Sequence, residues 1–150
     1  MMNMLESSIT AIYHNLLEAW NNKSAQDMAQ LFSTDGEMIG FDGSQINGSE
    51  EIFSHLHPIF EHHQTASFVS KVRSVRSLGT ETAMLRAIAG MVPPGQSEIN
   101  PKVNTHHTLI VVKENNDWKI QLFQNTPAQF HGRPELVEQM TEELREVLNN

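Results

Sequence analysis

Histidine is the residue type in this chain best suited to chemistry, because eight of the 150 residues are His. An imidazole titrates near neutral pH, so it can serve as an acid, a base or a metal ligand. The eight are His14, His55, His57, His62, His63, His106, His107 and His131. A metal site would need several of them to converge with a carboxylate such as Glu61, yet no His-x-x-x-His pair occurs. We therefore predict no metal site, and surface or helix-end positions for most of these histidines.

The pair His106 and His107 is the exception, because it falls inside an expected strand over residues 103–113. Successive side chains of a strand point to opposite faces of the sheet. One of the two should therefore face the interior, where a general base can act in isomerase, cyclase or hydratase chemistry. The sequence leaves open which of the two it is.

Arg86 and Asn125 are the polar side chains that would hold a substrate beside such a base. Arg86 interrupts the apolar stretch Met84-Leu85-Arg86-Ala87-Ile88 and could pair with an acidic ligand group. An arginine at an edge or a dimer face, with its head in water, explains it equally well. Asn125 is two residues from Phe123, so if Phe123 faces inward, Asn125 does too, offering a donor and acceptors. The alternative is an Asn-Thr-Pro strand exit that backbone groups satisfy.

Aromatic residues are expected to form the walls of the site. Trp20 ends the apolar stripe of the first helix and is more often a core residue than a ligand platform, although it can be both. Phe41, at the end of the first short strand, and Phe123 complete the expected ligand-binding set. The absence of cysteine excludes thiol catalysis, and neither a Gly-x-Ser-x-Gly elbow nor a phosphate-binding glycine loop occurs.

Helices at both ends of the chain are predicted to position these residues. Apolar residues at helical spacing predict a helix over residues 4–22. Ser24, with Asp27 three residues later, is typical of a second helix start. The buried face of that helix would be Met28, Leu31 and Phe32, and Asp35-Gly36 would end it.

Two further helix starts are indicated. Asn47 followed by Glu50 predicts a third helix, whose inward residues would be Ile52, Phe53 and Leu56. Pro58 is expected to end or kink that helix near His57. Pro134 is placed for the first turn of a last helix, about residues 134–148.

Strands occupy most of the second half. Residues 37–41 read as a short strand before an Asp42-Gly43 turn. Residues 67–78 and 82–91 form one expected hairpin, and residues 103–113 and 117–125 form another. This order predicts an α+β fold. Since Ile110, Val111 and Val112 are apolar on both strand faces, we expect a second copy of the chain to cover the outer face as a homodimer.

The order of elements resembles the nuclear transport factor 2-like superfamily, and within it the SnoaL-like branch of small bacterial proteins. The resemblance covers about residues 5–128. It is carried by Ala19-Trp20-Asn21, Leu31-Phe32, Asp35-Gly36, Gly48-Ser49-Glu50-Glu51-Ile52 and the hairpin ending in Phe123-Gln124-Asn125-Thr126-Pro127. It implies a cone-shaped, curved antiparallel sheet wrapped around N-terminal helices, with a pocket for a small apolar or amphipathic molecule. The superfamily includes enzymes such as ketosteroid isomerase and scytalone dehydratase, and also non-catalytic binding and assembly domains.

Ketosteroid isomerase offers a comparison for the chemistry. That family places a carboxylate base at the end of the first strand and a tyrosine in the first helix. Here the strand ends at Gly40 or Phe41, Asp42 stands one residue late, and Tyr13 lies a few positions early. These departures argue against isomerase chemistry.

Composition bounds the remaining possibilities. The length fits a single domain over residues 1–150, and a net charge of −8 argues against nucleic-acid and anionic-membrane partners. The first residues lack a basic start and an apolar run, and the absence of cysteine suits a reducing cytoplasm. We expect no cofactor. Our first hypothesis is a small-molecule-binding protein, followed by an enzyme with an inward histidine base, and then by an interaction or assembly domain.

Overall fold

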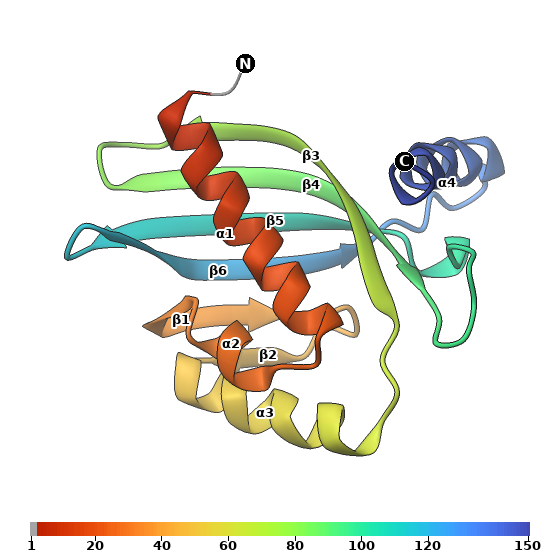
Figure 1. Cartoon of the computed structure of the whole chain (residues 1–150). Helices are drawn as coiled ribbons and strands as arrows, with labels where there is room; N and C mark the ends of the chain where they lie inside the picture. Colours follow the sequence, from red (N-terminus) through yellow and green to blue (C-terminus); the bar gives the residue numbers. More distant parts are fainter. Residues whose placement is uncertain (1–2) are drawn as a thin grey trace.

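The computed structural model describes residues 3–150, which form helices on one face of a six-stranded curved sheet and a last helix at its other side (Figure 1). The helices are α1 (Met4–Asn21), α2 (Ala25–Ala29), α3 (Ser49–His62) and α4 (Pro134–Leu148), with a 3₁₀ turn η1 at Pro101–Val103. The strands are β1 (Phe32–Ile39), β2 (Gln45–Asn47), β3 (Ser67–Ser77), β4 (Thr82–Val92), β5 (Thr105–Glu114) and β6 (Asp117–Pro127). The predicted α+β fold is confirmed.

The sheet has the order β2-β1-β6-β5-β4-β3. Its neighbours pair antiparallel except β1 and β6, which are parallel. Both predicted hairpins, β3–β4 and β5–β6, are present. No helix within residues 3–150 is long and apolar enough to cross a membrane.

Helix α1 lies across the sheet (Figure 1) and buries one apolar face against it. Its first turn is capped by Asn3, whose side-chain oxygen accepts from the Glu6 amide at 2.8 Å. Ile9, Tyr13 and Leu16 are fully buried on its sheet-facing side. We call the sheet face that contacts α1 the inner face and the opposite one the outer face.

The region after α2 differs from the prediction. The second helix has only five residues and is capped by Ser24 as expected, but Phe32 already belongs to β1. Asp35-Gly36 lies inside this strand, at an irregularity of the β1–β6 pairing, rather than ending a helix. A Cβ at Gly36 would stand 2.5 Å from the Ile120 carbonyl oxygen, so this close strand approach requires glycine. The short edge strand β2 was not predicted.

Helix α3 also departs from the prediction in its cap and its length. Its N-cap residue is Gly48, whose φ is 91°, rather than the predicted Asn47. The backbone amide of Asn47 donates to the carboxylate of Glu51 at 3.2 Å. The helix continues past Pro58 to His62. Proline removes one backbone donor, and this is tolerated because Pro58 lies on the exposed side of α3. Ile52 and Leu56 are buried as expected, whereas Phe53 is exposed.

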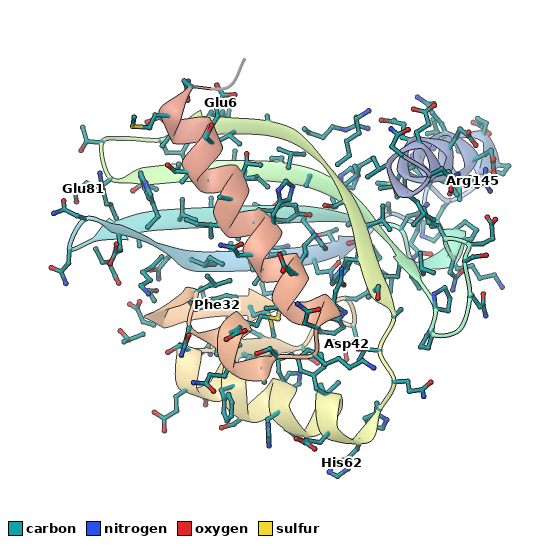
Figure 2. All side chains as sticks on the ribbon, viewed as in Figure 1. Glu6, Phe32, Asp42, His62, Glu81 and Arg145 are labelled. Atoms are coloured by element: carbon teal, nitrogen blue, oxygen red, sulfur yellow. The ribbon has the colours of Figure 1, made fainter. Side chains whose placement is uncertain are left out.

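Helix α4 begins at Pro134 as predicted and packs on the outer face at one end of the sheet. It forms a second apolar cluster with Ile88 and Ile99 through Met140 and Leu144. Glu143 of α4 pairs with Arg73 of β3 at 2.7 Å. Figure 2 shows Arg145 on this helix at one edge of the molecule and Glu81, in the β3–β4 hairpin, at the opposite edge.

Candidate functional site

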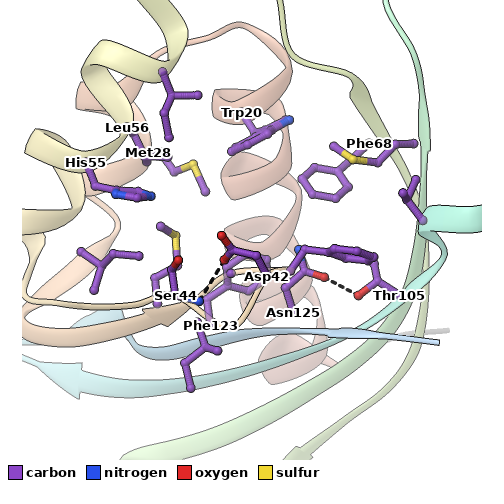
Figure 3. Close-up of a pocket in the computed structure, with 18 residues that line it drawn as sticks. Trp20, Met28, Asp42, Ser44, His55, Leu56, Phe68, Thr105, Phe123 and Asn125 are labelled. Atoms are coloured by element: carbon purple, nitrogen blue, oxygen red, sulfur yellow. Dashed lines mark hydrogen bonds between the residues drawn. The ribbon is translucent and has the colours of Figure 1, made fainter. Parts of the chain in front are cut away.

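A pocket of about 310 Å³ lies between the inner face and helices α1 to α3; we call it the inner pocket (Figure 3). Its aliphatic walls are Met28, Met38, Ile39, Ile46, Leu56, Ile59, Met91 and Val103, and its aromatic walls are Trp20, Phe41, Phe68 and Phe123. Gly40, Asp42, Ser44, His55, Thr105 and Asn125 complete the lining. An apolar concave site with a few polar groups is the usual form of a small-molecule site.

The aromatic wall is fixed by hydrogen bonds as well as by packing. The Trp20 indole nitrogen donates to the Ala66 carbonyl oxygen at 2.9 Å, and its ring lies 5.5 Å from the Phe68 ring, centre to centre. Asn21 binds the Phe68 backbone, accepting from its amide at 2.8 Å and donating to its carbonyl at 3.2 Å. The end of α1 is thus tied to the start of β3, which holds both rings in place.

Polar side chains gather where the β1–β2 turn meets α3. In the predicted Asp42-Gly43 turn, the Gly43 amide donates to the Gly40 carbonyl and the Asp42 carboxylate accepts from the Ser44 amide, both at 2.9 Å. These hydrogen bonds to Ser44 hold the pKa of Asp42 below its usual range. His55 of α3 also lines the pocket and lowers the same pKa to a lesser degree. Asp42, Ser44 and His55 are exposed, so this cluster forms the polar mouth of the inner pocket.

Asn125 supplies a polar group on the sheet side of the pocket (Figure 3). The Thr105 hydroxyl donates to the side-chain oxygen of Asn125. This contact orients the amide, and among residues 3–150 no hydrogen bond is found from its nitrogen. The Asn125 amide nitrogen is therefore a donor that a ligand can use.

His107 is the inward histidine of the pair, but it is packed in the core and does not line the pocket. Its Nδ1 lies 2.8 Å from the Tyr13 hydroxyl, and Phe68 and Phe123 contact its ring edge to face. Burial, with a smaller contribution from His106, lowers the pKa of His107 to about 3. Burial also raises the pKa of Tyr13 well above its usual value. Both side chains are therefore neutral at physiological pH.

His106 and Arg86 lie outside the inner pocket: His106 is the outward histidine of the pair, and Arg86 takes the solvent-facing alternative rather than a place beside a ligand. Strand alternation places both on the outer face, where His106 is half-buried beside Ile88 and α4 and Arg86 is exposed. Burial and then the charges of Arg86 and Arg73 lower the pKa of His106. None of the ion pairs found among residues 3–150 includes Arg86.

The remaining histidines do not converge. His57 and Glu61 approach to 3.9 Å on the exposed side of α3. In the described part of the chain, no group of three or more His, Cys, Asp or Glu side chains is arranged to hold a metal ion.

The structure brings together four of the sequence-predicted residues, Trp20, Phe41, Phe123 and Asn125, at one pocket. Sequence reasoning did not select Asp42 or His55 as site residues. Asp42 has a local signal, since it directly follows the predicted strand 37–41 in a turn, but it lies one residue past the place where ketosteroid isomerase carries its carboxylate. The strand itself ends earlier than predicted, at Ile39. His55 has none, because its place depends on how α3 packs.

The fold and the inner pocket define a class of protein: an α+β domain whose curved sheet and helices enclose a mostly apolar cavity. A family model described as SnoaL-like domain matches residues 9–124, and this chain belongs to that family. It has the nuclear transport factor 2-like fold, as the resemblance implied. No curated protein matches the sequence.

Solved structures agree on the fold. A domain of unknown function with a cystatin-like fold from Nostoc punctiforme has a TM-score of 0.80 and 23% identity, covering 99% of this chain and 95% of that one. An NTF-2 like protein of unknown function from Shewanella oneidensis has a TM-score of 0.68 and 17% identity, over 82% and 99%. A putative scytalone dehydratase from Novosphingobium aromaticivorans has a TM-score of 0.67 and 15% identity, covering 83% of this chain and 84% of that one. At such identities these likenesses establish the fold alone.

Proposed function

We propose that this SnoaL-like protein binds a small apolar or amphipathic molecule in the inner pocket. The observation that carries the proposal is a cavity of about 310 Å³ with aliphatic and aromatic walls and only a few polar groups. This volume stands at the low end of the range of roughly 300–1,000 Å³ for ligand sites, which favours a small ligand. Trp20, Phe41, Phe123 and Asn125 are the proposed contacts.

The distribution of polar groups favours an amphipathic ligand. Asp42, Ser44 and His55 lie at the exposed mouth, whereas Phe68 and Phe123 are buried in the wall. An apolar body would remove these walls from water, a gain of about 25 cal/mol per Å² of apolar surface. The polar end of the ligand would then remain at the mouth.

Binding of a neutral apolar dye, N-phenylnaphthylamine, tests the proposal. We expect saturable binding with one dye per chain, measured by dye fluorescence. Ile59→Trp adds a large side chain to the pocket wall, so it should weaken binding about tenfold or more by excluding the dye. Phe53→Trp is the matched control, because Phe53 lies on the same helix but is exposed and outside the pocket. Unsaturable binding, or equal binding to the Ile59→Trp variant, would refute a ligand site here.

Catalysis by an inward histidine is the alternative function, and the position of His107 gives it little support. A general base needs hydrogen-bond reach to the substrate and a pKa near the working pH. His107 is absent from the pocket lining, and its pKa is lowered to about 3. His106 faces the opposite side of the sheet. The likeness to a putative scytalone dehydratase concerns the fold and does not change this assessment.

We also propose that a second copy of this chain covers the exposed part of the outer face. The apolar outer positions there are only half-buried: Met84, Ile110, Val112 and Leu122. Light scattering should then give twice the chain mass of 17.0 kDa. Ile110→Lys should reduce it to one chain, while Leu78→Lys, an equal charge change at the exposed hairpin tip, should not. A wild-type monomer would end this proposal.

The location and the other partners remain proposals drawn from composition. We propose a cytoplasmic protein without nucleic-acid or membrane partners, on the basis of its net charge of −8 and its lack of cysteine.

A further inference from the structure

The mouth of the inner pocket is electrostatically one-sided. Among the described residues that line it, Asp42 is the one carboxylate, and no lysine or arginine is present. The rest of the lining is apolar or uncharged, apart from the imidazole of His55. A ligand therefore meets a single fixed charge, and that charge is negative.

The Asp42 carboxylate is held in position by its own turn. One oxygen accepts from the Ser44 amide at 2.9 Å, and Gly43, with φ of 91°, allows the chain to fold back for this contact. Figure 3 shows the carboxylate turned toward the cavity, between the helical wall and Asn125. A carboxylate has about four acceptor positions, so it can bind a ligand donor while keeping its contacts to Ser44. Because these contacts lower its pKa, Asp42 is ionised at neutral pH and is a weak base.

We infer that the ligand of the inner pocket is a small apolar amine, whose ammonium group lies beside Asp42 and whose apolar body lies against the aromatic wall. This inference rests on the proposed function and names the chemical class of its ligand. An ammonium donates a charge-assisted hydrogen bond to a carboxylate, which is stronger than a neutral one. Phe41, next to Asp42 at the mouth, and Trp20 offer ring faces that attract cations.

The charge of the whole chain acts in the same direction. A net charge of −8 raises the local concentration of cations and repels anions. An anionic ligand such as a fatty acid would have to place its carboxylate at a mouth that already holds Asp42. The same apolar walls would therefore bind a carboxylate ligand less tightly than an amine of the same shape.

His55 is the one group on the facing helix that could oppose the amine. Its imidazole lines the same mouth and interacts with Asp42 through charge. When protonated it would compete with the ligand for the carboxylate. The test is therefore run at about pH 8, because alkaline pH disfavours protonated imidazole while a primary amine stays charged.

The test compares three ligands of one shape: naphthylmethylamine, naphthylmethanol and naphthoate, each titrated calorimetrically into the wild-type chain. We expect the amine to bind about threefold to fivefold more tightly than the alcohol, because the Asp42 carboxylate is exposed, and the naphthoate to bind most weakly. Asp42→Asn keeps an oxygen acceptor for the Ser44 amide, so the turn is preserved, while it removes the charge and replaces the second oxygen with an NH2 donor. In this variant the amine should fall to the affinity of the alcohol, whose own binding stays unchanged. Asp117→Asn, an equal charge change at an exposed strand end, should keep the preference.

The outcomes separate the inference from the function on which it rests. Equal binding of amine and alcohol to the wild type, or a preference that survives Asp42→Asn, would overturn the amine while leaving a small-molecule site. Absence of saturable binding for all three ligands would overturn both. A preference that declines at high salt would support the charge contact, because screening weakens exposed pairs.

Discussion

The two faces of the sheet are different environments, and adjacent residues of one strand lie on opposite faces. His106 and His107 are adjacent on β5, yet His106 is half-buried on the outer face beside Arg73 and Glu143, and His107 is fully buried against Tyr13. The inner face carries the main core and the pocket. The outer face carries a small cluster under α4 and half-exposed apolar side chains elsewhere.

This difference shows that an inward position on the sheet does not by itself bring a side chain to the pocket. His107 satisfies one nitrogen through Tyr13, while its Nε2 has no hydrogen-bond partner among the described residues. It is enclosed by the rings of Phe68 and Phe123, which themselves face the pocket. His107 therefore supports the pocket wall from behind, whereas Asp42, Ser44 and His55 stand at the exposed mouth that the proposed ligand would meet.

The largest predicted effect contrasts two leucines on neighbouring strands. Leu109 faces inward and is fully buried, so Leu109→Ala should cost about 2–5 kcal/mol of unfolding free energy through lost burial and a cavity. Leu122 is half-buried on the outer face, so Leu122→Ala should cost less than about 1 kcal/mol within one chain. Urea denaturation followed by circular dichroism measures both, in the Ile110→Lys background that is expected to keep the chain a monomer. Similar costs would mean that the outer face is as well packed as the inner one.

The second prediction uses the two histidines and acid. The folded-state pKa of His107, about 3, lies below its unfolded value of roughly 6.5, so the unfolded chain binds an extra proton between them. The stability gained by keeping His107 neutral is fully present above the unfolded-state pKa of roughly 6.5. It is lost as pH falls toward the folded-state pKa of about 3. The unfolding free energy should therefore fall by about 1.4 kcal/mol for each pH unit near pH 5. Urea denaturation at several pH values measures this slope.

Glutamine substitutions separate the two positions. His107→Gln should be less stable at neutral pH, because it disturbs the hydrogen bond that the buried Tyr13 hydroxyl makes with the imidazole. The stability of this variant should change little between about pH 7 and 5, because the titrating group is gone. His106→Gln should keep most of the wild-type slope, since the pKa of His106 is also lowered but its side chain is only half-buried. This window lies above the range where most carboxylates titrate. A slope that persists in His107→Gln would place the responsible group elsewhere.

The fold was predictable because its signals are local. Helical spacing in residues 4–22, the Ser24 cap, the two hairpins and Pro134 all specify structure through neighbouring residues. The errors lie where distant contacts decide. Phe32 joins β1 because β6 pairs with it, and Pro58 stays helical because α3 buries Ile52 and Leu56 on its other side.

The site was only partly predictable for the same reason. Alternation correctly placed Phe123 and Asn125 on one face and divided the histidine pair between two. It did not say which face Arg86 takes, since β4 has apolar residues on both faces and its sequence therefore gives no contrast between them. The mouth of the pocket brings together Asp42 from the β1–β2 turn and His55 from α3. No spacing rule in the sequence predicts that these two residues meet.

The smallest predicted effect tests how firmly α4 covers its end of the outer face. Glu143 binds Arg73 at 2.7 Å and Lys71 at 3.5 Å, and these contacts hold its pKa below the usual range. Glu143→Gln should cost no more than about 1 kcal/mol, because the pairs are partly solvated. Hydrogen exchange of α4 amides should quicken in this variant, while exchange in α1 on the inner face stays unchanged. Met140 and Leu144 hold the helix by apolar contact, so a wholly detached α4 would show that ion pairs outweigh that cluster.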